Sequence, residues 1–239
     1  MQLEQLRRLY ARQILALANA FANVNLENAF AAVSREIFLG DGEWRINTPW
    51  FSDTLIPNDP ALIYQDVVVA LDRQRGVNNG SPSLHAHWLN VVTPRQGETV
   101  AHIGAGAGYY SAILSELVGD SGRVIAVEFD AALAARARVN LADRPNVAFI
   151  EGNGFDWPQA PADVVYVNFA ASRPANAWLE SLAIGGRLIF PPWRAAGRQL
   201  RRRQPCPECH CAGGDPSCRR LCSPGARPRF VRLCTEREA

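Results

Sequence analysis

The sequence contains no lysine, so its 25 basic residues are all arginine, which we attribute to a coding bias. No apolar run reaches about eighteen residues, which argues against a membrane-spanning helix. The N-terminal stretch MQLEQLRRLYARQIL mixes charged and apolar residues, which is typical of an amphipathic helix and not of a signal peptide. These absences predict a cytoplasmic protein that does not enter a membrane.

Cysteine is absent from residues 1–193, and all six cysteines lie in residues 194–239. The charges divide at the same place. The first part has 14 arginines and 19 acidic residues, whereas the second has 11 arginines and 4 acidic residues. The net charge of +2 therefore combines a mildly acidic body with a basic tail. An acidic body argues against nucleic acid as its partner.

The stretch from Thr99 to Asp130 is typical of a strand, a tight turn, a helix and a second strand. These features are Val100–Ile103, then Gly104, Gly106 and Gly108, then Tyr110–Val118, then Val124–Val127, which leads to Glu128. Glycines let the backbone approach a ligand, and a carboxylate accepts hydrogen bonds from both hydroxyls of a ribose. Such a βαβ unit therefore predicts an adenosine-containing ligand.

The glycine spacing distinguishes two kinds of ligand. A dinucleotide fingerprint has the form G-x-G-x-x-G, but Gly108 comes one residue early and Tyr109 stands where the third glycine belongs. The form G-x-G-x-G, with Glu128 twenty residues after its last glycine, resembles motif I and the acidic loop of the S-adenosylmethionine-dependent methyltransferases. Tyr109 therefore disfavours a nicotinamide oxidoreductase. A glycine turn that only closes an ordinary βα unit is the other alternative.

Four further segments resemble the protein-L-isoaspartate O-methyltransferases, in the order in which that family has them. Residues 29–39 resemble V-P-R-E-x-F-V, residues 63–66 A-Y-x-D, residues 151–154 G-D-G, and residues 185–191 G-G-R-L-V-x-P. A simpler interpretation of the first segment is an exposed pair of Arg35 and Glu36 at a helix end. The resemblance covers about residues 29–192.

The resemblance implies an α/β fold with a Rossmann-like, doubly wound, mostly parallel sheet and helices on both faces. Residues 1–60 are expected to hold helices at 3–19 and 26–34 and an irregular segment at 41–62 that covers a cleft. Residues 61–192 are expected to form the domain that binds S-adenosyl-L-methionine. Residues 193–239 lack an apolar pattern and are expected to be disordered, which leaves the last strands of the sheet in doubt.

Three interpretations of this tail stay open. Cys206, Cys209, Cys211, Cys218 and Cys222 supply enough thiolates for a tetrahedral zinc site, although their spacing fits no zinc module known to us. The arginines are typical of a segment that contacts nucleic acid or an acidic partner. An out-of-frame translation of a G+C-rich gene end also explains the composition. We assign no metal to the predicted site.

The resemblance places cofactor-binding residues at the carboxyl ends of four predicted strands. They are His102, Gly104, Ala105, Gly106, Gly108, Tyr109, Glu128, Phe129, Gly152, Asn153, Gly154 and Asn168. His102 stands where the family usually has an acid that orients the turn and the amino group of the cofactor. Asn153 replaces the aspartate of G-D-G, and its amide oxygen still accepts a hydrogen bond from an adenine amino group.

The acceptor site departs from the family's pattern. Where the family has T-I-S-x-P, residues 78–82 read N-N-G-S-P, which puts Gly80 at the serine position. Asn79, Gly80 and Ser81 are the candidate catalytic residues, and Ser81 supplies the missing hydroxyl only if the turn differs. We therefore expect Gly80→Ser to strengthen peptide methylation.

A helix is predicted over residues 82–93, because Pro82 suits a first helical turn. Its histidines, His85 and His87, are two residues apart and point to different faces, so they cannot both enter one site. A lone histidine on a helix is more often packed or solvated than catalytic.

The predicted cofactor limits the reaction. Methyl transfer from a sulfonium is an in-line displacement, and a carboxylate with a pKa near about 4 is already ionised at neutral pH and needs no general base. A hydroxyl or amine acceptor needs a base, and none is conspicuous. The sequence thus favours a carboxyl O-methyltransferase whose partner is a protein or peptide with a free carboxylate, as in protein repair. A catalytically silent domain that binds S-adenosylmethionine or another protein is the alternative.

Overall fold

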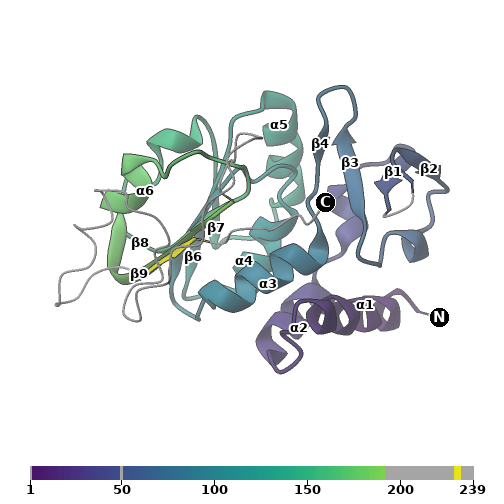
Figure 1. The fold of residues 1–239 in the computed structure, drawn as a ribbon, viewed down its shortest axis with the longest axis horizontal. Coiled ribbons are helices and arrows are strands. Elements are labelled where there is room, and N and C mark those ends of the chain that lie inside the picture. The colour runs from purple at the N-terminus through teal and green to yellow at the C-terminus, as the bar shows by residue number, and fades with distance from the viewer. Residues whose placement is uncertain (1, 49–50, 192–228, 233–239) are drawn as a thin grey trace, which may run out of the picture.

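A six-stranded parallel sheet forms the centre of the protein, in a computed structural model that describes residues 2–48, 51–191 and 229–232 (Figure 1). The strand order is β10-β9-β8-β5-β6-β7, and every described pairing in this sheet is parallel. The strands are β5 (Thr99–Ile103), β6 (Arg123–Glu128), β7 (Val147–Glu151), β8 (Ala162–Val167), β9 (Leu182–Phe190) and β10 (Arg229–Arg232). The chain winds outward from β5 in both directions, so a ligand-binding switch point lies at the carboxyl end of β5.

Apolar side chains cover both faces of this sheet, because successive residues of a strand point to opposite sides. Val100 and Val124 pack on one face with helices α3 (Pro82–Val92) and α4 (Tyr109–Val118). Ala101 and Ile103 pack on the other with Trp178. Trp178 belongs to α6 (Asn176–Glu180), and α5 (Ala131–Asn140) lies beside β6 and β7. The predicted α/β fold with helices on both faces is confirmed.

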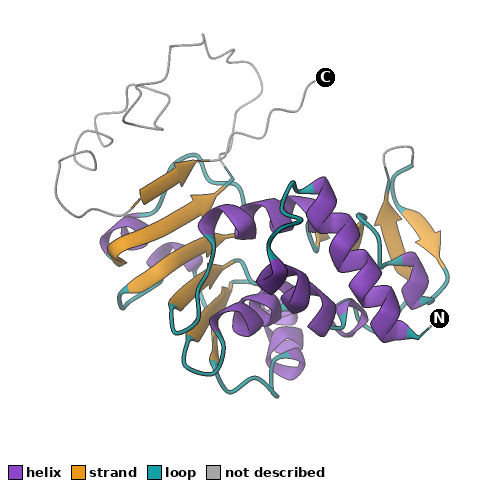
Figure 2. Ribbon diagram, turned by 90° about the horizontal axis from the view of Figure 1, so that it is seen from below, coloured by secondary structure: helices purple, strands orange, loops and turns teal. Residues whose placement is uncertain are grey.

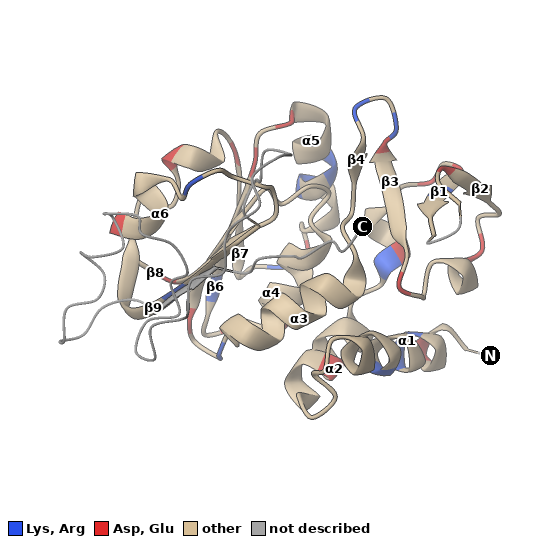
Figure 3. Cartoon of the chain, viewed as in Figure 1, with Lys and Arg blue, Asp and Glu red and all other residues tan. Residues whose placement is uncertain are grey.

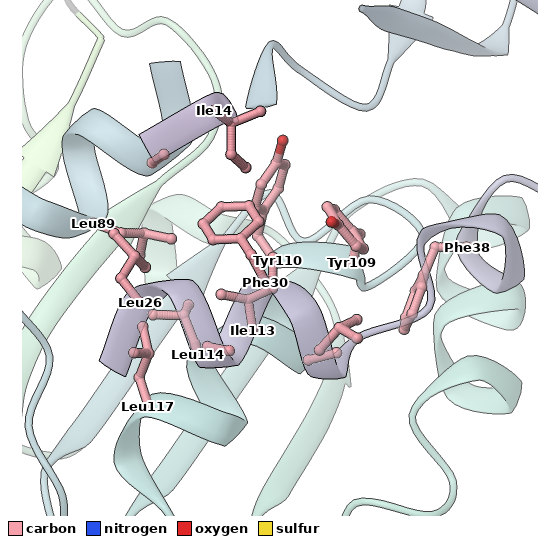
Figure 4. Close-up of a cluster of buried hydrophobic side chains, with 14 of the residues drawn as sticks. Ile14, Leu26, Phe30, Phe38, Leu89, Tyr109, Tyr110, Ile113, Leu114 and Leu117 are labelled. Atoms are coloured by element: carbon pink, nitrogen blue, oxygen red, sulfur yellow. The ribbon is translucent and has the colours of Figure 1, made fainter. Parts of the chain in front are cut away.

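Two N-terminal helices, α1 (Leu3–Leu17) and α2 (Val24–Ala32), pack against α3 and α4. Side chains from all four helices form one buried cluster. Among them are Ile14, Leu26, Phe30, Leu89, Ile113, Leu114 and Leu117 (Figure 4). The helices predicted at 3–19 and 26–34 are thus present, with each α2 end two residues earlier. None of the helices that the structure describes is long and apolar enough to cross a membrane.

A second, antiparallel sheet was not anticipated. It has the order β2-β1-β3-β4 and lies on the side of the molecule away from β8 and β9 (Figures 1 and 2). Its strands are β1 (Trp44–Asn47), β2 (Thr54–Ile56), β3 (Val68–Asp72) and β4 (Val77–Asn78). A short 3-10 helix, η2 (Pro60–Leu62), lies between β2 and β3 in the sequence. Trp44 and Ile46 are buried because they alternate along β1, and Ile46 pairs with Val69. Part of the predicted irregular segment 41–62 therefore forms strands β1 and β2 of this sheet. The sheet includes strands on both sides of residue 60, where the sequence predicted a domain boundary.

Most of the predicted tail, 193–239, lies outside the described residues, as do its cysteines. Arg229–Arg232 is the exception, because it forms β10 beside β9. β10 runs parallel to β9 and forms the edge of the large sheet. The predictions of disorder, of a zinc site and of an arginine-rich contact segment stay predictions.

Candidate active site

A cavity of about 280 Å³ opens at the carboxyl ends of β5, β6 and β8. Gly104 and Gly106 follow β5, Glu128 ends β6, and Asn168 follows β8. Parallel strands bring their carboxyl ends to one edge of a sheet, so residues far apart in the sequence meet here. The cavity therefore lies at the switch point defined by the strand order.

The turn after β5 is bent tightly enough to require glycine. Gly104, Gly106 and Gly108 have φ values of +78°, +58° and +98°, which disfavour residues with a side chain. A Cβ atom at Gly104 would lie 2.9 Å from the ring of Phe169. The amide N–H groups of Gly104 and Ala105 both donate to the carbonyl of Val127, at 2.9 and 3.0 Å. The turn is thereby held against the end of β6.

Glu128 is buried beside this turn, with 9% of its surface exposed. Its Oε2 accepts a hydrogen bond from the Gly106 N–H at 2.7 Å, and its Oε1 accepts one from the Asp130 N–H at 2.9 Å. A carboxylate has about four acceptor positions, so about two stay available for hydroxyl groups of a ligand. Gly104 and Glu128 both line the cavity, which is the juxtaposition that the sequence predicted.

The small sheet supplies a wall that the sequence did not reveal. Arg75 lies in the turn between β3 and β4, coloured as basic in Figure 3, and forms ion pairs with Asp72 and Asp130. Hydrogen bonding by Arg75 lowers the pKa of Asp130, so the carboxylate stays charged at neutral pH. Leu71 and Val77 of the same hairpin also line the cavity. The hairpin is thus fastened across the cavity to the start of α5.

The buried guanidinium of Arg35 holds the segment that leads into β3. Arg35 lies in a short 3-10 helix, η1 (Arg35–Phe38), and is 0% exposed. It donates to the carbonyl groups of Gln65 at 3.0 Å and Val67 at 2.6 Å, and also to that of Ile63. The interpretation as an exposed Arg-Glu pair was wrong for Arg35. This side chain instead joins two of the segments that resemble the family, residues 29–39 and 63–66.

Asp66, the last residue of the segment 63–66, orients the first turn of α3. Asp66 accepts hydrogen bonds from the N–H of Ser83 at 2.9 Å and from the hydroxyl of Ser81 at 3.3 Å. The Ser81 hydroxyl also accepts a bond from the Leu84 N–H at 3.4 Å, so it caps the helix. Ser81 does not line the cavity, whereas Asn79 and Gly80 do.

One histidine near the cavity, His102, does not contribute to its lining. His102 is fully buried on β5, and its Nδ1 lies 2.7 Å from the Ser111 hydroxyl of α4. Burial lowers the pKa of His102 to about 3, so the ring is neutral at pH 7. His102 therefore joins β5 to α4 and does not line the cavity.

Comparison with known proteins identifies the family. The family model described as protein-L-isoaspartate(D-aspartate) O-methyltransferase (PCMT) matches residues 20–204. The chain belongs to the PCMT family. Protein-L-isoaspartate O-methyltransferase 1 of Archaeoglobus fulgidus is 31% identical over 195 residues, covering 80% of this chain and 81% of that protein. The resemblance drawn from five short motifs is confirmed.

Two other relatives match over a smaller share of their length. The Thermotoga maritima protein-L-isoaspartate O-methyltransferase is 32% identical over 151 residues, which is 61% of this chain and 46% of that protein. A solved protein-L-isoaspartate O-methyltransferase, 26% identical with a TM-score of 0.63, is matched over 77% of this chain and 55% of its own. This chain thus spans about half the length of these two. A Plasmodium falciparum protein named as a β-aspartate methyltransferase, solved with S-adenosyl-L-homocysteine, has a TM-score of 0.62 and 18% identity over 80% of this chain and 85% of its own. It shows the fold alone.

Of the residues predicted from the PCMT resemblance, the structure brings one group together around the cavity. This group is Asn79, Gly80, Gly104, Ala105, Gly106, Tyr109, Glu128 and Asn168. The others do not line it: Ser81, His102, Gly108, Phe129, Gly152, Asn153 and Gly154. Phe129 is 78% exposed, and the side chain of Asn153 caps the 3-10 helix η3 (Gly154–Asp156) by accepting from the Phe155 N–H.

Several lining residues escaped the sequence reasoning. They are Phe38, Leu71, Arg75, Val77, Asn78, His85, Ala107, Tyr110, Asp130, Leu133 and Phe169. Asp130 and Phe169 lie within three residues of the ends of predicted strands, so their positions at the ligand-binding edge were a usable signal. Arg75 and its hairpin carried no such signal. Within the described residues, no group of three or more His, Cys, Asp or Glu side chains is arranged to hold a metal ion.

Proposed function

We infer that this protein transfers a methyl group from S-adenosyl-L-methionine to the free carboxylate of an isoaspartyl residue in a protein or peptide. The observation that carries this proposal is the shared cavity of the glycine turn, Glu128 and the Asn79-Gly80 segment. A donor site and an acceptor site must adjoin for an in-line displacement. The family membership supports the same reaction.

The residues present fit the cofactor. At Gly104 and Gly106 no Cβ atom stands between the backbone and a ligand, and Glu128 keeps about two acceptor positions for ribose hydroxyls. Asn168 also lines the cavity, and its side chain lies within reach of the buried His102. When bound, S-adenosylmethionine supplies a methyl group on a positively charged sulfonium.

The chain's own contribution is orientation and exclusion of water. Phe38, Tyr109 and Phe169 give the cavity apolar walls, which strengthen electrostatic contacts and limit hydrolysis. A carboxylate acceptor is ionised at neutral pH, so no residue has to remove a proton from it. An isoaspartyl residue carries such a carboxylate next to its backbone, because its side chain has entered the peptide link.

Calorimetry and a transfer assay together test this proposal. We expect S-adenosylhomocysteine to bind the full chain and NAD not to bind. Labelled S-adenosylmethionine should transfer its methyl group to an isoaspartyl peptide and not to the same peptide with normal aspartate. Binding of NAD alone would remove the proposal in favour of an oxidoreductase. Binding of S-adenosylhomocysteine without methylation of the peptide would favour a silent domain.

A further inference from the structure

The space that a side chain at residue 80 would occupy is filled by a histidine. Gly80 has a φ of +74°, and a Cβ atom built on it would lie 2.3 Å from Nε2 of His85. The two residues line the same cavity as the glycine turn and Asn168. The imidazole edge thus stands where the PCMT family resemblance places a serine hydroxyl.

The ring of His85 is held rigidly. Its Nδ1 lies 2.7 Å from the hydroxyl of Tyr166 on β8. Its plane stacks on Tyr110 of α4, with ring centroids 3.6 Å apart and an interplanar angle of 17°. Trp88 packs against it edge-on at 5.5 Å. Such constraints fix where Nε2 points, which is what a ligand-positioning group requires.

The hydrogen bond to Tyr166 decides which ring nitrogen carries the proton. Burial keeps His85 neutral at pH 7 by lowering its pKa to about 3, so only one nitrogen is protonated. His85 is the only hydrogen-bond partner of the Tyr166 hydroxyl among the described residues. If the Tyr166 hydroxyl donates its proton to Nδ1, that proton has an acceptor. If the hydroxyl instead accepts a hydrogen bond from Nδ1–H, its own proton stays buried without an acceptor. The favoured arrangement leaves the N–H on Nε2, which has no partner within the described chain.

We propose that the Nε2–H of His85 binds the acceptor carboxylate and takes over the task of the hydroxyl that Gly80 lacks. The hydrogen bond engages one carboxylate oxygen and leaves the other free to attack. In the transfer, a bond forms between that oxygen and the methyl carbon, the carbon–sulfur bond breaks, and its electron pair stays on sulfur. A neutral donor holds the carboxylate without forming an ion pair that would weaken the nucleophile. This role rests on the proposed function, because it names the acceptor contact of that reaction.

Two substitutions separate this contact from a structural role. His85→Asn places an amide oxygen near the position of Nδ1, so it keeps an acceptor for Tyr166 and loses the donor at Nε2. His85→Gln places an amide N–H near Nε2 and loses the acceptor for Tyr166. Both lose the stacked ring equally. His87→Asn serves as a control, because His87 does not line the cavity and contacts the Ala18 carbonyl.

We expect the Asn variant to lose at least about tenfold more kcat/KM for an isoaspartyl peptide than the Gln variant. Affinity for S-adenosylhomocysteine should stay within about threefold of the parent in both. In the presence of S-adenosylhomocysteine, the parent should bind the isoaspartyl peptide more tightly than its isoasparaginyl counterpart. His85→Asn should erase that preference, and His85→Gln should keep it.

The binding arm also distinguishes this proposal from the proposed function. If the parent protein binds the carboxylate peptide more tightly but transfers no methyl group, the enzyme proposal is wrong. The loss or survival of that binding preference in His85→Asn then still decides the role of His85. A preference that survives in His85→Asn would overturn the role of His85 while the methylation stands. A parent without any preference between the two peptides would overturn it as well.

Discussion

The two halves of the cavity are built by different parts of the chain. The proposed cofactor half consists of strand ends of the parallel sheet, where backbone hydrogen bonds to Val127 and the Glu128 carboxylate hold the glycine turn. The proposed acceptor half consists of residues 66–85, held by side chains from elsewhere, including Arg35 and Tyr166. A site held by main-chain contacts of a sheet tolerates substitutions elsewhere in the chain. A site held by buried side chains depends on each of them, and in the acceptor half Gly80 stands where the family's pattern has a serine.

The largest expected effect is on the cofactor half. Glu128→Ala should lower the affinity for S-adenosylhomocysteine by at least about 100-fold, since two hydrogen bonds to a charged acceptor are lost at about 1.5–3 kcal/mol each. Titration calorimetry measures this. Glu151→Ala is the matched control, because Glu151 pairs with Glu128 across β6 and β7 but forms an ion pair with Arg138 outside the cavity. Equal binding by parent and Glu128→Ala would contradict the assignment.

The next effect tests whether the acceptor half depends on Arg35. Arg35→Met leaves the carbonyl groups of Ile63, Gln65 and Val67 without this donor and should lower the free energy of unfolding by about 3 kcal/mol. Urea denaturation measures the change, with Arg8→Met on the exposed face of α1 as a control expected to stay within about 0.5 kcal/mol. Peptide KM should rise more than the Kd for S-adenosylhomocysteine. A larger increase in the Kd for S-adenosylhomocysteine than in the peptide KM would contradict the division of the cavity into two separately held halves.

A third substitution reverses an expectation drawn from the sequence. The structure gives Gly80→Ser a clash with His85 and a strained backbone, so it should lower stability and methylation and not restore them. Gly76→Ser is the control, because Gly76 has a φ of +68° but nothing within 4 Å of its Cβ position. We expect Gly80→Ser to cost about 2 kcal/mol more than Gly76→Ser in urea denaturation. Increased methylation by Gly80→Ser would contradict this expectation and show that the His85 side chain moves to make room for the serine.

The smallest effect is a pH dependence shared by both halves. His85 and His102 have pKa values of about 3 in the folded protein, against about 6.5 when unfolded. Between those values the unfolded state binds more protons, so stability is full above about pH 6.5 and falls as the pH decreases. From pH 7 to 5.5 each histidine should remove about 1 kcal/mol from the free energy of unfolding. His85→Gln and His102→Gln should each remove the contribution of one histidine to the pH dependence of the free energy of unfolding. An unchanged pH dependence in both variants would contradict this expectation.

The sequence anticipated what short-range pattern controls. Alternating glycines, an apolar run on either side and an acid at a strand end specify the parallel βαβ unit, because strand, turn and carboxylate are close in sequence. Gly104 and Glu128 could therefore be placed together in advance. The small sheet was missed because β1, β2 and β4 are four residues or fewer and lie among turn-forming residues.

Sequence by itself thus determined the parallel α/β fold, the family and the proximity of Gly104 to Glu128. Only the tertiary structure decided that Ser81 caps a helix, that Phe129 points outward, that Arg75 closes the cavity wall and that His85 fills the space beside Gly80. The physical reason is the range of the interactions. Backbone pairing repeats along the chain and leaves a pattern, whereas a buried side chain such as His85 is oriented by Tyr166, 81 residues away, and leaves none.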